Sequence, residues 1–561
     1  MASSNRPGAD LIADALAQLG VRVVFGIVGI PVIEVAEAAI ARGIKFISFR
    51  NEQAASYAAS AYGYLTGRPG VLLVVGGPGV LHALAGIGNA TANCFPLVVL
   101  AGSAEREQRH RGAFQEMDQV AFLAPLTKHA EQPATAALVP AALERAFRAA
   151  AYGRPGPAYV DLPADIIRGK WPAPTAVSPV PAPPRAAGDP ARIAAAAQLV
   201  RRARAPLIIV GKGAAYGRAE AALRRLVATT GIAFLPTPMG KGVVSDAAAE
   251  NVASARTAAL KAADVVLVFG ARLNWILHYA AAPKFQPDAR IVQVDGHAEE
   301  LGANNARGAD LAILGDVGLV ATGLADALAG YRAPALPAAV AASRKKNTER
   351  AAARAALAKV PLSYEHSYAI IRGVLAEASR PIVYVSEGAN SMDIARSAFD
   401  MAEPRMRLDA GSSATMGVGV GYAIAAALAR PDATVVAIEG DSAFGFSAME
   451  IDTAVRAGLA MIVFVMNNGG VYHGVHPAAY ESGQPLPSTA LGLETKYDQL
   501  AESLGARGFV VRTPDELAAA ARAALHCGTV AVVNVVMDPG ADRKLEFAWL
   551  ASADTAAAAK L

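Results

Sequence analysis

The chain of 561 residues has a formal net charge of +4, with 53% hydrophobic and 18% charged residues. A chain of this length predicts several domains, and this composition excludes a disordered protein. The small net charge gives no indication of a nucleic-acid partner, and no apolar run reaches the length needed to span a membrane, so we expect neither partner.

Cysteine usage and the chain ends bear on the cellular compartment. The two cysteines, Cys94 and Cys527, cannot form a disulfide framework, which indicates a reducing environment and a cytoplasmic protein. The N-terminus lacks the plan of a signal peptide. The chain ends in Ala-Lys-Leu, which is similar to the peroxisomal Ser-Lys-Leu signal. This ending would indicate a peroxisomal location if it is native and the source is a eukaryote. An Ala-rich tail or a cloning remnant explains this ending at least as well.

Alternating strand and helix patterns predict a first α/β domain over residues 1–172. A strand at 23–27 runs into a glycine turn that carries Ile30, and a strand at 44–49 leads to Glu52. Glu52 opens a run of small residues that predicts a closely packed helix. A glutamate in the first turn of a helix is by itself typical of a favourable charge beside the helix dipole.

The same domain continues with a buried strand and a polar loop. The strand at 71–75 ends in a glycine run at 76–79, where the backbone can approach a ligand closely. The loop at 111–119 contains Phe114 and Gln115. A loop of this composition is usually solvated, so the loop alone predicts no function.

A proline-rich segment at 171–190 predicts a semi-rigid linker to a second α/β domain, residues 190–335. Gly211-Lys212-Gly213 follows its first expected strand and is a weak nucleotide signal. Asp295 ends its last expected strand and could either bind ribose hydroxyls or cap a helix. A second linker follows, which is rich in Ala, Arg and Lys and is expected to be partly helical.

The third α/β domain is assigned to residues 363–540, and two of its strand ends carry polar side chains. A strand at 434–438 ends just before Asp441, and a strand at 461–466 ends just before Asn468. If these strands are neighbours, the Asp441 carboxylate and the Asn468 amide oxygen converge on one ion. Such hard oxygen ligands suit magnesium shared with a phosphate. Two polar loop ends on a parallel sheet are the alternative reading.

The segment from Gly440-Asp441-Ser442 to Asn467-Asn468 resembles the thiamine-diphosphate motif in residues and spacing. The resemblance implies that Asp441, Asn468 and the carbonyl of Gly470 hold a magnesium ion bound to the diphosphate. It also implies that Glu52 contacts the aminopyrimidine ring of the cofactor and that Met416 supports its bent form, with ordinary core packing as the alternative for Met416. The other implied cofactor contacts are Gly388, Ala389, Asn390, Gly440, Ser442, Ala443 and Tyr472.

Further segments are similar to the group of 2-hydroxyacyl-CoA lyases and oxalyl-CoA decarboxylases, and they cover nearly the whole chain. These segments are 51–55, 64–71, 112–116, 270–275 and 439–447. The resemblance implies three Rossmann-like parallel-sheet domains in the order pyrimidine-binding, central and diphosphate-binding, with ADP or coenzyme A as candidate ligands of the central domain. It also implies an acyl-CoA substrate and a homodimer or homotetramer with active sites between subunits.

Two features favour a lyase within this group. This chain has Phe114-Gln115 at the loop position where the decarboxylases have a pair similar to Tyr-Glu. Residues 541–561 include a segment similar to the C-terminal end of the lyases, and this segment is expected to form a lid. The implied reaction is reversible cleavage of a 2-hydroxyacyl-CoA to formyl-CoA and an aldehyde or ketone. Oxalyl-CoA decarboxylation and a non-catalytic homologue are the alternatives.

The resemblance also implies roles for individual residues around the substrate. The catalytic candidates are Glu52, Gln115 and Glu494. The candidates for binding the substrate or coenzyme A are Ile30, Phe114, Gln115, Arg256, Arg396, Arg543 and Lys544.

Overall fold

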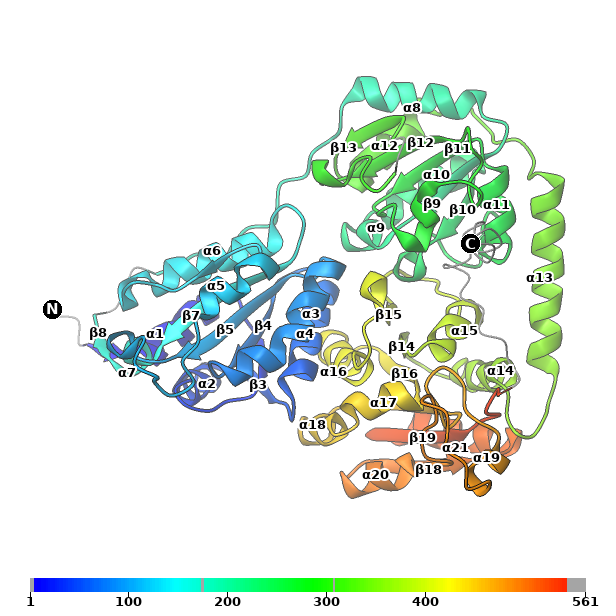
Figure 1. Cartoon of the computed structure of the whole chain (residues 1–561). Helices are drawn as coiled ribbons and strands as arrows, with labels where there is room; N and C mark the ends of the chain where they lie inside the picture. Colours follow the sequence, from blue (N-terminus) through cyan, green and yellow to red (C-terminus); the bar gives the residue numbers. More distant parts are fainter. Residues whose placement is uncertain (1–4, 173–175, 306–307, 542–561) are drawn as a thin grey trace, which may run out of the picture.

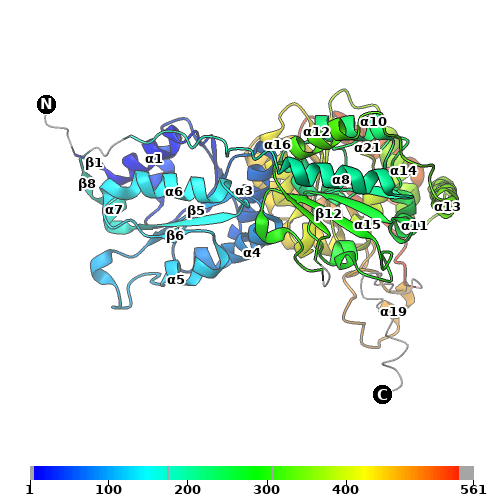
Figure 2. The ribbon, with the colours of Figure 1, turned by 90° about the horizontal axis from the view of Figure 1, so that it is seen from above.

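The computed structural model describes residues 5–172, 176–305 and 308–541, which form three α/β units arranged around a common centre (Figure 1). Each unit is built on one parallel sheet, as the sequence predicted, and Figure 2 shows helices on both faces of the sheet in the first unit. The strands are almost continuously apolar because both faces of each sheet are buried. Arg543 and Lys544 lie outside the described residues.

The first sheet has the strand order β3-β2-β4-β5-β7-β6, with all neighbours parallel. Its strands are β2 (Val23–Gly26), β3 (Lys45–Ser48), β4 (Gly70–Val74), β5 (Leu97–Ser103), β6 (Ala130–Glu131) and β7 (Pro157–Pro163). Its main helices are α1 (Gly8–Gln18), α2 (Ile33–Ile40), α3 (Glu52–Thr66), α4 (Pro78–Asn93) and α6 (Val139–Ala151). Outside this sheet, β1 (Arg6–Pro7) pairs with β8 (Lys170–Trp171), which precedes the proline-rich linker.

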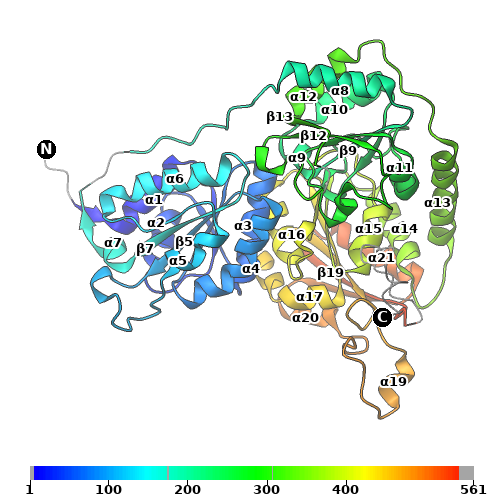
Figure 3. The ribbon, with the colours of Figure 1, turned by 45° about the horizontal axis from the view of Figure 1, so that its top comes forward.

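The central sheet has the order β10-β9-β11-β12-β13 and is also parallel. Its strands are β9 (Pro206–Val210), β10 (Ala233–Pro236), β11 (Val265–Phe269), β12 (Arg290–Asp295) and β13 (Leu311–Leu314). Its helices are α8 (Pro190–Arg202), α9 (Lys212–Tyr216), α10 (Glu220–Thr230), α11 (Arg256–Ala262) and α12 (Val317–Ala327). The second linker contains a long helix, α13 (Ala338–Ala356), which runs along the edge of the molecule to the third unit (Figure 3).

The third sheet has the order β15-β14-β16-β17-β19-β18. Its strands are β14 (Ile382–Glu387), β15 (Arg407–Asp409), β16 (Thr434–Gly440), β17 (Met461–Asn467), β18 (Arg507–Val511) and β19 (Val530–Val536). Its helices are α14 (Tyr364–Leu375), α15 (Asn390–Ala398), α16 (Gly419–Ala429), α17 (Asp441–Ser447), α18 (Glu450–Arg456), α19 (Pro477–Glu481), α20 (Tyr497–Ser503) and α21 (Pro514–His526).

In each sheet the first strand in chain order lies second from one edge, and the strand order reverses beside it. The reversal falls between β2 and β4, between β9 and β11, and between β14 and β16. Chain connections on the two sides of such a point leave in opposite directions, so a crevice opens at the carboxyl ends of the two strands. These three switch points are where ligands are expected.

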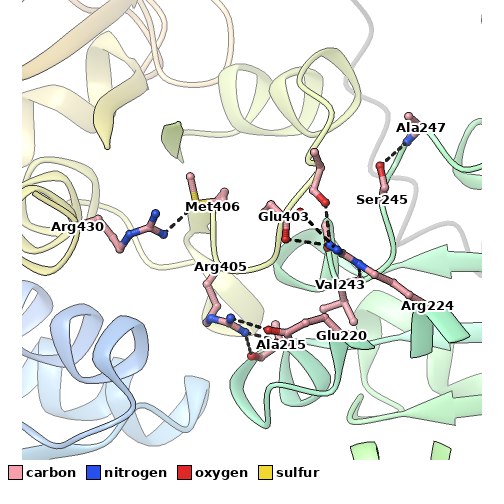
Figure 4. Close-up of polar contacts among 12 residues, drawn as sticks. Ala215, Glu220, Arg224, Val243, Ser245, Ala247, Glu403, Arg405, Met406 and Arg430 are labelled. Carbon is pink, nitrogen blue, oxygen red and sulfur yellow. Dashed lines mark hydrogen bonds and ion pairs between the residues drawn. The ribbon is translucent and has the colours of Figure 1, made fainter. Parts of the chain in front are cut away.

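Contacts between the units hold these edges in place. Helix α3 of the first unit packs along α16 of the third, and Asn89 Nδ2 donates a 2.7 Å hydrogen bond to Tyr422 Oη across the same interface. The central and third units are joined by ion pairs, Arg405 to Glu220 at 2.8 Å and Arg224 to Glu403 at 3.0 Å (Figure 4). No helix in the described part of the chain is both long enough and apolar enough to cross a membrane.

Candidate active site

The third switch point brings together the two oxygen ligands that the sequence singled out. Strands β16 and β17 are direct neighbours, with Gly440 opposite Met466, so Asp441 and Asn468 follow adjacent strand ends. The two loops are also tied together, since the backbone N–H of Gly469 donates to Asp441 Oδ2 at 2.8 Å. The expected pairing of the two strands is confirmed, and both side chains are buried.

Asp441 and Asn468 have the chemistry of a magnesium site. Asp441 Oδ1 accepts a hydrogen bond from its neighbour Ser442, and Asn468 Oδ1 accepts one from the backbone N–H of Gly470 at 3.1 Å. Burial raises the pKa of Asp441 to about 6, although backbone N–H groups lower it. A buried carboxyl group of this kind gains most from a cation, which stabilises its charged form.

A cradle for phosphate groups lies beside these ligands, across β14 and β16. Gly388 has a φ of +96°, and a Cβ there would lie 2.4 Å from Ser391 Oγ and 3.3 Å from the backbone nitrogen of Gly440. The two strand ends therefore approach as closely as glycine allows. Helices α15 and α17 both begin at this edge, so their first backbone N–H groups lie beside it. The residues present fit a diphosphate held through a divalent cation.

The remaining predicted cofactor residues lie at the same edge. Asn390 Nδ2 and Asn468 Nδ2 both donate to the backbone oxygen of Tyr472, at 2.7 and 3.3 Å. Tyr472 has a φ of 72°, which is a strained conformation for a non-glycine residue. Met416 is half-buried rather than part of the core and precedes Gly417, which has a φ of +89°.

The turn that carries Met416 is held by a buried carboxyl pair that the sequence reasoning missed. Glu387 Oε2 accepts a 2.5 Å hydrogen bond from the backbone N–H of Gly419, and Glu387 also accepts from Gly417. Glu439 lies opposite Glu387 on the next strand, and its oxygens have no hydrogen-bond partner within the described ranges. Burial raises the pKa of Glu387 to about 8, and burial together with Glu387 raises the pKa of Glu439. A proton on one of the two carboxyl groups would remove the repulsion between them.

At the first switch point, Glu52 lies at the start of α3. Asn51 caps this helix, because its side chain accepts a hydrogen bond from the backbone N–H of Gln53 at 2.8 Å. The backbone N–H groups of Arg50 and Asn51 donate to the carboxylate of Glu450 on α18, which fixes the helix start against the third unit. The Glu52 carboxylate itself meets His82 of α4, with 3.1 Å between Oε2 and Nδ1. The sequence reasoning did not identify His82.

The predicted substrate loop lies against the glycine run of the same edge. Gln119 Oε1 accepts a 2.6 Å hydrogen bond from the backbone N–H of Gly77, and a Cβ at Gly77 would lie 2.8 Å from the backbone oxygen of Gln115. Phe114 is 69% exposed and Ile30 is 54% exposed. Exposed apolar side chains at a strand-end crevice are suited to binding an apolar group or a second chain.

The third-unit loop that follows Asn468 carries Glu494, which the structure pairs with Arg512 at 2.6 Å. Within the described residues, no hydrogen bond or ion pair joins Glu494 to Asp441 or Asn468. Its predicted role in catalysis stays a prediction.

A cavity of about 580 Å³ lies where the three units meet, and it includes the second switch point. Lys212, Arg218 and Arg272 line it, and within the described part of the chain none of them forms an ion pair with a carboxylate. Burial lowers the pKa of Lys212 to about 8. Asp295 also lines it and accepts a hydrogen bond from the backbone N–H of His297, so it caps no long helix. Cations without carboxylate partners favour an anionic ligand here.

The two arginines predicted to bind coenzyme A differ in their contacts. Arg396 lines the cavity and forms ion pairs with Asp409 at 3.1 Å and with Asp393 at 2.6 Å. Arg256 donates to the backbone oxygen of Ile276, and burial together with the nearby Arg396 lowers its pKa.

Comparisons with known proteins agree with this geometry. The description "Thiamine pyrophosphate enzyme, N-terminal TPP binding domain" matches residues 6–122, the central domain of the same enzymes matches 193–324, and their C-terminal TPP binding domain matches 387–535. The chain is 44% identical to 2-hydroxyacyl-CoA lyase 1 of Mus musculus, covering 97% of this chain and 96% of the relative.

Two other relatives are similar over comparable lengths. Identity is 43% with 2-hydroxyacyl-CoA lyase of Saccharomyces cerevisiae, covering 96% of this chain and 97% of the relative. It is 38% with oxalyl-CoA decarboxylase of Escherichia coli, covering 95% of each chain. The chain therefore belongs to the thiamine pyrophosphate enzymes, in the family of 2-hydroxyacyl-CoA lyases and oxalyl-CoA decarboxylases.

Proposed function

We propose that the protein is a carbon–carbon lyase that reversibly cleaves 2-hydroxyacyl-CoA to formyl-CoA and an aldehyde or ketone. The observation that carries this proposal is 43–44% identity, over nearly the whole chain, with proteins named 2-hydroxyacyl-CoA lyase. Identity with a protein named oxalyl-CoA decarboxylase is lower, at 38%. The pair Phe114-Gln115 supports the same choice.

The proposed division of the chain follows the three sheets, with residues 1–172 binding the pyrimidine and 363–540 binding the diphosphate. Thiamine diphosphate, when bound, supplies a nucleophilic carbon and an electron sink. Asp441, Asn468 and the carbonyl of Gly470 would hold a magnesium ion beside the diphosphate. The buried pair of hard oxygen ligands beside the Gly388–Gly440 cradle supports this assignment.

The chain's own residues do the remaining work. Glu52 would share a proton with the ring nitrogen of the cofactor, and Met416 would support the cofactor from the turn held by Glu387. Ile30, Phe114 and Gln115 bind the acyl group and exclude water from it. The exposure of Ile30 and Phe114 beside the glycine run supports this role, since an acyl group can reach both side chains there.

We propose that the active unit is at least a homodimer, in which the first unit of one chain completes the third unit of another. Within the described residues, no hydrogen bond or ion pair joins Glu52 or Gln115 to Asp441 or Asn468. Apolar side chains are exposed on both units, including Phe114 at 69% and Phe446 at 58%. A second copy would cover both.

Mixing two inactive variants tests the shared site. Glu52→Gln and Asp441→Ala homodimers should each be inactive, but an exchanged heterodimer holds one site with neither defect. Complete exchange in an equal mixture should therefore restore about a quarter of wild-type activity. Mixtures that stay inactive although mass spectrometry shows heterodimers would exclude a shared site.

We also propose that the cavity at the second switch point binds an adenine nucleotide such as ADP, or that part of coenzyme A. Lys212, Arg218 and Arg272 support an anionic ligand, and Asp295 can accept hydrogen bonds from ribose hydroxyls. A cytoplasmic location is proposed from the cysteine content alone.

Incubation with competing substrates tests the proposed activity. Purified protein with thiamine diphosphate and magnesium is given either a 2-hydroxyacyl-CoA or oxalyl-CoA, and products are followed by mass spectrometry. Formyl-CoA with an aldehyde or ketone from the first substrate, at a much higher kcat/KM, is the expected result. Faster conversion of oxalyl-CoA with release of carbon dioxide would establish the decarboxylase instead.

A further inference from the structure

Glu52 and His82 face each other because two helices cross at a fixed point. A Cβ at Gly86 of α4 would lie 1.8 Å from Ser56 Oγ of α3, so the two backbones pack directly together there. Glu52 lies one helical turn before Ser56, and His82 lies one turn before Gly86. The glycine contact therefore sets the 3.1 Å distance between Glu52 Oε2 and His82 Nδ1.

The surroundings of the two side chains are unequal. The Glu52 side chain is 11% exposed and the His82 side chain is 63% exposed. In the described part of the chain, His82 is the one side chain that hydrogen bonds to the Glu52 carboxylate. The helix start itself is held by Glu450, through the backbone N–H groups of Arg50 and Asn51. The backbone of Glu52 is thus fixed from one side and its carboxylate from the other.

We propose that His82 is a positioning residue for Glu52. A carboxylate only accepts hydrogen bonds, so the contact requires the imidazole proton on Nδ1, which donates to Oε2. The second oxygen, Oε1, then stays available for the cofactor ring. This role rests on the proposed function of Glu52, while the hydrogen bond itself does not.

The physical need for such a residue follows from the length of the glutamate side chain. Glutamate has several rotatable bonds, and holding it in one rotamer costs conformational entropy. A donor at a fixed place restricts the carboxylate before the cofactor binds, which keeps the proton-sharing oxygen in line. Loss of the donor should therefore slow proton removal from the cofactor more than it weakens cofactor binding.

Three substitutions separate hydrogen bonding from packing. The amide nitrogen of Asn can occupy the position of Nδ1, whereas the amide nitrogen of Gln reaches the position of Nε2, and Leu has no donor. His82→Asn should stay within about threefold of wild type, whereas His82→Gln and His82→Leu should slow the reaction about 10- to 100-fold. The readout is exchange of the C2 proton of bound thiamine diphosphate in D₂O, followed by quenched-flow NMR.

Proton exchange needs no acyl-CoA, so failure of this inference is distinguishable from failure of the proposed substrate. Cofactor affinity, measured by calorimetry, should change less than about threefold in all three variants. Unchanged exchange in His82→Leu would overturn the inference. Equal loss in His82→Asn and His82→Leu would also overturn it, because a donor at Nδ1 would then not be the required feature.

A second measurement covers variants that fail to fold. ¹⁵N NMR of the histidine rings in the cofactor-free wild type should show His82, identified by its absence in His82→Asn, with its proton on Nδ1. In Glu52→Ala the ring should change to the tautomer with the proton on Nε2. A wild-type ring with its neutral proton already on Nε2 would overturn the inference whatever the kinetics.

Discussion

The central and third sheets have the same strand arrangement around their switch points, β10-β9-β11 and β15-β14-β16, yet the two switch points carry opposite chemistry. At the third, Gly388 and Gly440 approach across β14 and β16, beside the oxygens of Asp441 and Asn468. At the central one, Gly211 meets Gly270 across β9 and β11, where a Cβ would lie 2.1 Å from the Gly270 oxygen. Both edges have the close glycine contact, so the contact alone does not select a ligand.

The residues after the glycines make the difference. Asp441 follows directly at the third edge and suits a cation, whereas Lys212 follows at the central edge and suits an anion. The fold therefore supplies the same crevice twice, and the side chains decide what each crevice binds. The predictions below test this division, beginning with the largest effect.

The largest effect is expected at the first switch point. There, Glu52 should take part in the reaction but should not bind the diphosphate of the cofactor. Glu52→Gln should lower kcat by about 100- to 10,000-fold, because the amide cannot share a proton with the cofactor ring. Cofactor affinity should change little, since the diphosphate contacts lie in the third unit. Steady-state assays at saturating cofactor provide the check, and near-wild-type turnover would remove Glu52 from the mechanism.

Asp441→Ala should weaken binding of thiamine diphosphate with magnesium by at least about 100-fold, because the bridging ion loses its one carboxylate ligand. Asp295→Ala is the matched control, since it removes a carboxylate from the same edge of the central sheet. Calorimetry should show the control unchanged. Equal affinity in Asp441→Ala and wild type would contradict the assignment of the third switch point.

Lys212→Met should weaken ADP binding by about 10- to 100-fold, because the buried ammonium group that favours an anion is lost. Burial lowers the Lys212 pKa to about 8, so ADP binding by the wild type should also weaken as the pH rises above about 8 and the ammonium group loses its proton. Affinity measured at pH 7 and pH 9 tests both statements. A pH dependence that persists in Lys212→Met would assign the titration to another group.

The smallest effect concerns stability. Glu387 binds its proton more tightly in the folded state, where its pKa is about 8, than in the unfolded chain. The resulting stabilisation is fully present below the unfolded pKa and is lost as pH rises through about 8. The cofactor-free protein should therefore become less stable as the pH rises from 5 to 8.

Glu439→Gln provides the variant for that test. The substitution removes the second carboxyl group, and the new amide can donate to Glu387 at any pH. The thermal unfolding midpoint of the variant should therefore depend less on pH than that of the wild type. An unchanged pH dependence would show that the carboxyl pair does not share a proton.

The sequence predicted the fold and the closeness of Asp441 to Asn468 because both depend on local patterns. Asp441 and Asn468 each follow an apolar strand, and these two consecutive strands, β16 and β17, pair with each other. His82 could not be found in this way, because its contact with Glu52 depends on the crossing of two helices at Gly86 and Ser56. Glu387 and Glu439 needed the register between β14 and β16, which the order of residues along the chain does not reveal.

Titration of one preparation with both ligands tests the central claim most directly. Protein saturated with thiamine diphosphate and magnesium should still bind one ADP per chain, with the same affinity as the cofactor-free protein. Asp441→Ala should lose the cofactor and keep ADP, and Lys212→Met should do the reverse. Competition between the two ligands, or the loss of both in either variant, would contradict the division between the two switch points.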